Sequence, residues 1–499
     1  MELIDNIWLG LSVAATPENL LLCLLGCLLG TVIGVLPGIG PLATMAMLLP
    51  VTFHLAPAGA LIVLAGVYYG AQYGGSTTAI LLNLPGEASA VVTCLDGHAM
   101  ARQGRGGIAL ATAALSSLIA GCLTTVLIAT AAPALANVAL LFQSADYVAV
   151  LVLGLVAAVA LSQGSLLKAI AGILIGVTLG LVGTDISTGE HRLTFGLPTL
   201  IDGLDFVPIA MGLFGIAEIV SNLNTTDGKG VPPVAITRIW PNLKELASMV
   251  KPALRGTVVG SAFGLLPGGG PTIAAFSSYS FEKKVSKTPG AFGKGELAGV
   301  ASPEAANNAA AQASFIPMLS LGIPPSALMA LMIGAMMIHG ITPGPSFIDK
   351  QPQLFWSLVV SMWIGNMILV LLNLPLIRVW ILLLRVPYRI LFPGILLLCC
   401  IGTYSVSNSI SDVVIMAVFG FVGWIFKLMR VEPAPILMGL VLGPMLEENL
   451  RRALGVSGGD AMVFLERPIS ATLLTVAALI LILAALPAVR VKRDKVFVE

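Results

Sequence analysis

Charged residues are scarce in this sequence. Only 10% of its 499 residues are Asp, Glu, Lys or Arg, whereas soluble domains carry about 25%. So few charges cannot cover a globular surface with water-facing groups. The hydrophobic share of 57% and the mean hydropathy of +0.97 instead indicate a membrane protein. A net charge of +1 and an aromatic share of 6% argue against a nucleic-acid partner.

Motifs for enzyme chemistry are also missing. The sequence has no G-x-S-x-G, no H-E-x-x-H and no complete G-x-x-x-x-G-K-[ST], so we expect no enzyme and no ATP-driven motor. No cofactor or metal site is expected either, apart from Na⁺ or H⁺ as a coupling ion. The N-terminus lacks the positive charge of a signal peptide. The cysteines form no C-x-x-C pair and are expected to be small packing residues: Cys23, Cys27, Cys94, Cys122, Cys399 and Cys400.

Long apolar runs recur along the whole chain. A helix of about 20 apolar residues crosses the roughly 30 Å of hydrocarbon in a bilayer. The sequence therefore predicts one all-α polytopic membrane domain over residues 1–499, with about 10–12 membrane segments that include re-entrant or broken hairpins. The candidate segments lie near 18–36, 57–82, 107–130, 145–161, 165–183, 207–222, 353–374, 390–408, 412–428 and 468–488.

Lysine and arginine gather in a few loops, which the positive-inside rule places in the cytoplasm. The more acidic stretch 183–205 is predicted to be external. The basic segments are 96–106, 222–255, 282–296, 378–389 and the tail 490–495.

Two of these basic loops enclose a segment that is too short to cross the membrane twice. Only the 26 residues 256–281 separate loops 222–255 and 282–296, while two full spans need about 40 residues. The segment must then enter and leave on the same side. The sequence LPGGGP at 266–271 breaks the helix at its midpoint. We therefore expect a re-entrant hairpin whose tip reaches the middle of the membrane.

The same punctuation occurs earlier in the chain. LPGIGP at 36–41 is echoed by LPGGGP at 266–271, and GTVIG at 30–34 by GTVVG at 256–260, with four extra residues between the two blocks. Gly/Pro-interrupted apolar segments at corresponding places in two halves are the best sequence indication of a transporter binding site.

A second correspondence follows the first. Ala71-Gln72 stands ahead of the break at 84–86 as Ala311-Gln312 stands ahead of the break at 323–325. Each half thus carries two broken segments in the same order. We expect all four breaks to converge on one central cavity.

The repeat divides the chain into two related halves. The first half is 18–221, with breaks at 36–41 and 84–86; residues 222–255 are a cytoplasmic linker; the second half is 256–499, with breaks at 266–271 and 323–325. The first copy follows a stretch without Lys or Arg and the second follows the most basic loop, which predicts an inverted topology.

Polar and glycine residues beside the breaks are the candidate binding residues. A carboxylate at membrane depth needs hydrogen-bond donors, which exposed backbone N–H groups at helix N-termini supply. Hydroxyl, amide and carbonyl oxygens there also suit Na⁺. Close packing of small residues is the structural alternative. The candidates are Gly38, Gly40, Ser76, Thr77, Thr78, Asn83, Gly268, Gly269, Gly270, Asn307, Asn308, Ser314 and Ser320.

Three further ionisable residues remain open. Glu87 and Glu304 follow helix-breaking prolines and are either helix caps or proton-coupling groups. Among the histidines, His339 is the one that merits a test. Glu447 and Arg451, at helical spacing, predict an external amphipathic helix more than a docking site.

Several motifs together resemble the TctA family, the large membrane subunit of the tripartite tricarboxylate transporters. The resemblance covers nearly the whole chain and is carried by GVLPGIGP at 34–41, YGAQYGGST at 69–77, NLPGE at 83–87, SPEAANNA at 302–309 and GPMLEENLRR at 443–452.

The resemblance implies ion-driven uptake of citrate or a related carboxylate across the bacterial inner membrane. It also implies two partners, a small TctB-like membrane subunit and a TctC-like periplasmic solute-binding protein. The alternatives that the residues leave open are a stand-alone secondary carrier and a channel for small anions.

Overall fold

The computed structural model of the chain describes residues 2–36, 40–161, 165–185, 188–222, 238–266, 270–383 and 388–485. These residues fold almost entirely into helices, which confirms the predicted all-α polytopic architecture. The sequence did not predict the one small exception, an antiparallel hairpin that pairs Gly183 with Arg192 and Thr184 with His191.

The elements up to residue 222, in chain order, are α1 (Glu2–Ala14), which precedes the first half, and then α2 (Pro17–Val35), α3 (Pro41–Phe53), α4 (Pro57–Leu82), η1 (Ala88–Ala90), α5 (Val91–Thr93), η2 (Cys94–His98), η3 (Ala101–Arg105), α6 (Gly106–Ala139), α7 (Ser144–Leu161), α8 (Leu166–Gly180), β1 (Gly183–Thr184), β2 (His191–Arg192), η4 (Pro198–Leu200), α9 (Phe206–Ala210), η5 (Met211–Ile216) and α10 (Ala217–Asn222).

The elements of the second half are α11 (Leu243–Gly264), α12 (Gly270–Val285), η6 (Pro289–Ala291), α13 (Ala298–Ala313), α14 (Phe315–Leu321), α15 (Ala327–Ile338), α16 (Pro345–Lys350), α17 (Pro352–Asn373), α18 (Ile377–Leu383), α19 (Tyr388–Ser407), α20 (Ile410–Leu428), α21 (Ala434–Val456), α22 (Val463–Glu466) and α23 (Pro468–Ala485).

Every predicted apolar segment corresponds to one helix, except 207–222, which corresponds to the consecutive helical elements α9, η5 and α10. Five helical stretches in the described ranges are long and apolar enough to cross a membrane: Pro17–Val35, Ala101–Ala139, Pro352–Asn373, Ile410–Leu428 and Pro468–Ala485. The protein is therefore a multi-pass membrane protein. Helix α4 is different, because nearly all of its 26 residues are buried by other helices.

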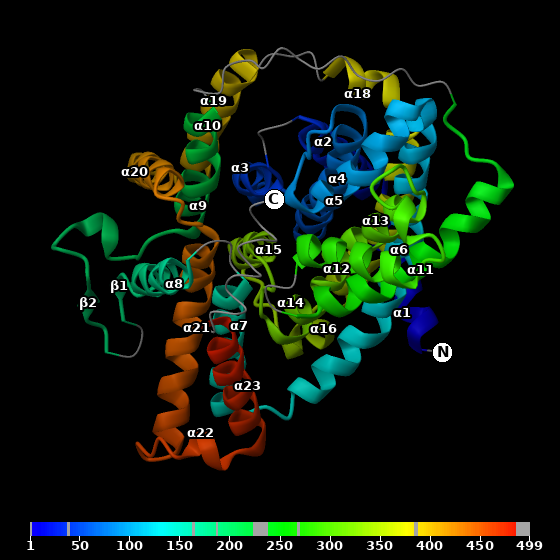
Figure 1. The fold of residues 1–499 in the computed structure, drawn as a ribbon. Helices are drawn as coiled ribbons and strands as arrows, with labels where there is room; N and C mark the ends of the chain where they lie inside the picture. Colours follow the sequence, from blue (N-terminus) through cyan, green and yellow to red (C-terminus); the bar gives the residue numbers. More distant parts are fainter. Residues whose placement is uncertain are drawn as a thin grey trace.

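The helices form two groups (Figure 1). In the view shown, α2, α4, α6 and α11–α13 lie on the right, whereas α7, α8 and α21–α23 lie on the left with the β hairpin. Helices α3 and α15 lie between the groups. This arrangement leaves the interior of the molecule to the segments that the sequence marks as broken.

Rows of glycine bring the first helix of each hairpin against a buried neighbour. A Cβ added at Gly30 of α2 would lie 2.3 Å from the carbonyl oxygen of Val67 in α4. A Cβ added at Gly260 of α11 would lie 2.2 Å from the carbonyl oxygen of Ala306 in α13. Glycine at these positions therefore permits backbone-to-backbone contact, as in other close membrane helix pairs.

The packing corrects the register expected for the repeat. The contacting glycines are Gly26, Gly30 and Gly34 in α2, and Gly256, Gly260 and Gly264 in α11. Gly34 and Gly264 each stand two residues before the Leu-Pro of the break, so the repeat contains no four-residue insertion.

The facing helices give a second correction. Gly34 packs on the carbonyl of Ala71, and Gly264 on the carbonyl of Ala310. The structural partner of Ala71 is therefore Ala310 and not Ala311, because sequence similarity alone shifted the match by one residue.

The two units run in opposite directions. Helix α2 is parallel to α4, and α11 is parallel to α13, because the glycine contacts advance together along each pair. Helix α4 runs antiparallel to α13 and the following α14, since Ser76 bonds Glu304 of α13 while Tyr69 contacts Phe315 at the start of α14. The hairpin units are thus related by an inversion of direction, as the loop charges predict.

The second break of each half, at 84–86 and at 323–325, has the same flanking backbone conformation. Asn83 ends α4 with φ 57°, and Gly322 ends α14 with φ 73°, so both residues are left-handed caps. Glu87 then precedes η1 with φ −148° and ψ 167°, and Ser326 precedes α15 with φ −150° and ψ 166°. Asn and Gly are the residues that adopt the left-handed conformation at least cost.

Two of the loops that are predicted to be cytoplasmic, 96–106 and 282–296, also contact each other. Gln103 donates to the carbonyl of Lys294 at 2.8 Å, and the backbone N–H groups of Gly293, Gly295 and Glu296 donate to the Asp96 carboxylate. The basic loops 96–106 and 282–296 therefore lie on one side. Helix α11 already begins at Leu243, so residues 243–255 belong to it rather than to a loop.

The hairpin directions predict opposite chemical accessibility. With the six native cysteines replaced, Val250→Cys and Ser286→Cys should both react with a membrane-impermeant thiol reagent from the cytoplasmic side. Glu18→Cys and His54→Cys should react from the external side, because α2 and α4 begin at the opposite end. Labelling of the members of either pair from different sides would contradict the hairpins.

The glycine contacts predict a selective loss of stability. Gly260→Ala should destabilise the fold by about 1–3 kcal/mol, because the methyl group meets backbone rather than a movable side chain. Gly455→Ala in α21 is the matched control, since a Cβ there meets no atom within 4 Å. The apparent midpoint of thermal unfolding in detergent should fall for the first variant and not for the second; equal midpoints would contradict the packing argument.

Candidate functional site

One cavity of about 400 Å³ is lined by residues from all four breaks. Its size falls in the range usual for small-molecule sites. Gly40-Pro41 come from the first break, Gly86 from the second, Gly270-Pro271 from the third and Pro325 from the fourth. The other lining residues are Leu42, Gln72, Glu87, Ala88, Ser89, Ala158, Thr272, Ile273, Ser326, Ala327, Leu328, Glu432, Ala434, Pro435 and Met438.

Three helices begin at this cavity. Helix α3 starts at Pro41, α12 starts at Gly270, and α15 follows the N-cap Ser326. The first N–H groups of a helix have no partner within that helix, and the helix dipole places partial positive charge there. Each helix start is made by the residues that break the preceding segment. The cavity thus receives the positive ends of three helices, an arrangement that favours an anion.

Glu87 carries a carboxylate at the wall of this cavity. Its Oε1 accepts hydrogen bonds from Ser89 Oγ at 2.6 Å and from Asn307 Nδ2 at 3.4 Å. The neighbouring Gly86 packs tightly, because an added Cβ would lie 2.1 Å from the carbonyl oxygen of Gly34. The close approach to α2 therefore fixes the position of Glu87 at the edge of the cavity.

Glu304 is a second carboxylate, buried where α4 crosses α13. Its side chain accepts hydrogen bonds from Ser76 Oγ at 2.7 Å and from Thr93 Oγ1. Glu304 is only 1% exposed. The two carboxylates belong to one polar cluster, because Ser89 also lies 3.3 Å from Oε1 of Gln72, one turn before Ser76.

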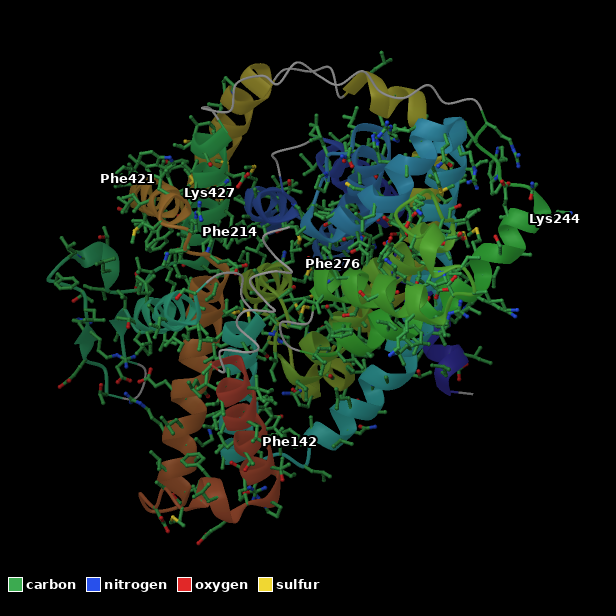
Figure 2. All side chains as sticks on the ribbon, viewed as in Figure 1. Phe142, Phe214, Lys244, Phe276, Phe421 and Lys427 are labelled. Atoms are coloured by element: carbon green, nitrogen blue, oxygen red, sulfur yellow. The ribbon has the colours of Figure 1, made fainter. Side chains whose placement is uncertain are left out.

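Acidic residues provide the charged side chains in the described lining of the main cavity. Glu87 lies on one wall and Glu432 on another. Glu432 also lines an adjacent cavity of about 540 Å³, together with Arg430 and the ion pair of Lys427 with Glu218. Figure 2 labels Lys427 beside α20 and α10. The donors that face the main cavity are therefore backbone groups and neutral side chains.

The predicted site residues fall into four sets. Gly40 and Gly270 line the main cavity. Ser76, Thr77 and Asn307 lie in or beside the polar cluster that adjoins it. The residues Gly38, Gly268 and Gly269 lie outside the described ranges.

The remaining predicted residues are engaged by the protein itself. Ser314 and Ser320 donate to carbonyls of their own helices, at 2.7 and 2.6 Å, and Thr78 donates to Gly75 at 2.9 Å. Asn308 donates to Ser117 Oγ at 2.6 Å, while Asn83 is an exposed helix cap. Four of these five residues thus have side-chain hydrogen bonds within the protein, and Asn83 ends α4.

Sequence reasoning did not identify several cavity residues. Thr272 and Ser326 each follow a proline directly, and Glu432 directly precedes one. All three therefore stand near helix starts. The pattern of a helix-breaking proline followed by a cap residue could have indicated Ser326. Glu432 had no such indication, because only the fold brings α21 to the cavity.

Two other predicted features join elements of the fold. His339 Nε2 lies 3.1 Å from the carbonyl oxygen of Thr52, so it connects the ends of α15 and α3. Arg192 bonds Glu447 at 2.6 Å, and Arg451 bonds Asp185 at 2.8 Å. These ion pairs attach the β hairpin segment to α21.

Comparison with known proteins places this fold in a family. The model of the family described as "Tripartite tricarboxylate transporter TctA family" matches residues 20–438. An Agrobacterium vitis protein described as an uncharacterized 52.8 kDa protein in the TAR-I ttuC' 3' region is 54% identical over 499 residues, which is 100% of this chain and 99% of that protein.

A second Agrobacterium vitis protein, described as an uncharacterized protein in the TAR-II ttuC' 3' region, is 55% identical over 240 residues, or 48% of this chain and 99% of that protein. No solved structure matches the chain. The family match over most of the chain confirms the resemblance seen in its motifs: the protein belongs to the tripartite tricarboxylate transporter TctA family.

Proposed function

We propose that this chain is the permease subunit of an ion-gradient-driven tripartite transporter that takes up citrate or a related carboxylate across the bacterial inner membrane. The observation that carries the proposal is the convergence of four breaks and three helix starts on one cavity of about 400 Å³. Backbone N–H groups at such helix starts bind carboxylates without a buried cationic side chain.

A gradient of cations suits the charges in this cavity. Glu87 lines it, and its negative charge would repel an incoming carboxylate. Binding of Na⁺ or H⁺ with the substrate would offset that repulsion. This physical requirement supports cation symport over a simple anion channel.

A separate receptor suits the small size of the external segments. Within the described residues, the stretches predicted to be external are the β hairpin region of 183–205 and the helix ends of 447–467. Segments of about 20 residues are too short to fold into a ligand-capturing domain. We therefore propose that a TctC-like periplasmic protein delivers the substrate, and that a TctB-like membrane subunit completes the transporter.

A negative charge at a helix start should block the proposed carboxylate site. Thr272 lies in the first turn of α12 and lines the cavity. Thr272→Asp should keep the helix stable, because an acidic residue suits that position, yet repel the substrate. We expect the KM for uptake to rise by at least about tenfold. Thr272→Asn is the neutral, isosteric control, and a normal KM for Thr272→Asp would place the substrate elsewhere.

Reconstitution tests the transporter itself. Proteoliposomes that contain this chain and its small membrane partner should accumulate a labelled carboxylate from a panel when the receptor and an imposed Na⁺ or H⁺ gradient are both present. Uptake at low substrate concentration should be lost without the receptor. Undiminished uptake without it would identify a stand-alone carrier, and passive flux alone would identify a channel.

A further inference from the structure

A second, much smaller cavity lies at the polar cluster that adjoins the main cavity. Its volume is about 10 Å³, which is room for a single water-sized particle. It lies between α4, α6, α13 and the end of α17. The polar residues that line it are Tyr73, Ser76, Thr77, Ser117, Glu304 and Asn373.

Glu304 is the charged group of this small cavity. Hydroxyl groups of Ser76 and Thr93 donate to its carboxylate, but hydroxyl groups do not neutralise a charge. In the described part of the chain, no lysine, arginine or histidine forms a salt bridge with Glu304. A buried carboxylate inside a membrane protein is costly unless a cation accompanies it.

Two buried oxygen atoms of the same cavity have no hydrogen-bond partner among the described residues. These are Tyr73 Oη and Asn373 Oδ1, on side chains that are 4% and 5% exposed. The amide nitrogen of Asn373 already donates to the carbonyl of Leu369 at 2.8 Å, so the free end of this amide is its oxygen. An unsatisfied buried oxygen in a native fold calls for a water molecule or an ion.

The polar side chains of the small cavity offer oxygen atoms. Carboxylate, amide and hydroxyl oxygens are the ligands that a hard cation prefers. We propose that Glu304, with Ser76, Ser117, Tyr73 and Asn373, binds the one monovalent cation, Na⁺ or H⁺, that accompanies the carboxylate. This inference rests on the proposed transport function and assigns it a residue.

One chain of polar contacts links the small cavity to the main cavity. Ser76 Oγ lies 2.7 Å from Glu304 and 3.2 Å from the carbonyl oxygen of Gln72. The side chain of Gln72 then contacts Ser89, which donates to Glu87 at the wall of the main cavity. A cation at Glu304 removes a negative charge from this cluster, so cation and substrate each strengthen the binding of the other.

The other titratable groups around Glu304 are few. Glu87 and Cys94 face it from segment 87–98, and Tyr73 faces it from α4. Helices α6 and α17 contribute the neutral polar groups Ser117 and Asn373 to the described lining. Asp96, near the start of α13, is already held by backbone N–H groups. A test of cation binding must therefore distinguish the contribution of Glu304 from that of Glu87.

Cation binding can be measured without transport. The purified full chain in detergent should gain thermal stability as NaCl replaces choline chloride, or as the pH is lowered in the absence of Na⁺. Glu304→Gln, which has the shape of the protonated acid, should lose this dependence. Glu466→Gln, at an exposed glutamate of α22, is the matched control and should retain it.

The two cations are distinguished by a second pair of variants. If Na⁺ is bound, Asn373→Ala should raise the half-saturating Na⁺ concentration by about tenfold or more, because it removes a ligand. If H⁺ is bound, Asn373→Ala should leave the pH dependence in place while Glu304→Gln removes it. Should Glu304→Gln fail to fold, Glu304→Asp serves instead and should shift the half-saturating cation concentration or pH.

Uptake then separates this inference from the proposed function. Glu304→Gln should bind carboxylate but fail to concentrate it in proteoliposomes. An unchanged cation response in Glu304→Gln, or loss of the response in Glu87→Gln alone, would overturn the assignment to Glu304 while carboxylate transport stands. A small cavity that holds only a water molecule, with no cation response in the wild type, would overturn it as well. Absence of any carboxylate uptake by the wild type with its partners would instead overturn the proposed function.

Discussion

Backbone that leaves the helical path inside a membrane has no water to satisfy its N–H and C=O groups. Much of the architecture of this protein follows from that constraint. Four breaks are marked in the sequence, and described residues beside each of them line one cavity. Polar backbone is thus available where a ligand can bind it, and the surrounding helices are needed to enclose it.

Glycine contacts make that enclosure possible. Helices α2 and α11 approach α4 and α13 so closely that a single added Cβ at Gly30 or Gly260 would overlap a carbonyl oxygen. This contact holds the first helix of each hairpin against a buried neighbour. Because the two units run in opposite directions, helix starts from both halves line the same cavity.

The charges of the centre complement this backbone arrangement. Helix starts provide partial positive charge, whereas Glu87 and Glu304 provide two carboxylates at one crossing of helices. The proposed anion and the cation proposed to accompany it would therefore each favour the binding of the other in this region.

The sequence by itself determined the membrane class, the positions of the helices and the four breaks, because hydropathy and Gly/Pro punctuation are local properties of the chain. It also predicted the inverted direction of the repeat, through loop charge, and the helix contacts then decided that direction. Only the tertiary structure decided the register of the repeat and the separation of cavity residues from helix caps such as Asn83. The meeting of Glu304 with Tyr73, Ser117 and Asn373 was likewise invisible in sequence, since these residues lie far apart along the chain and become neighbours only through long-range packing.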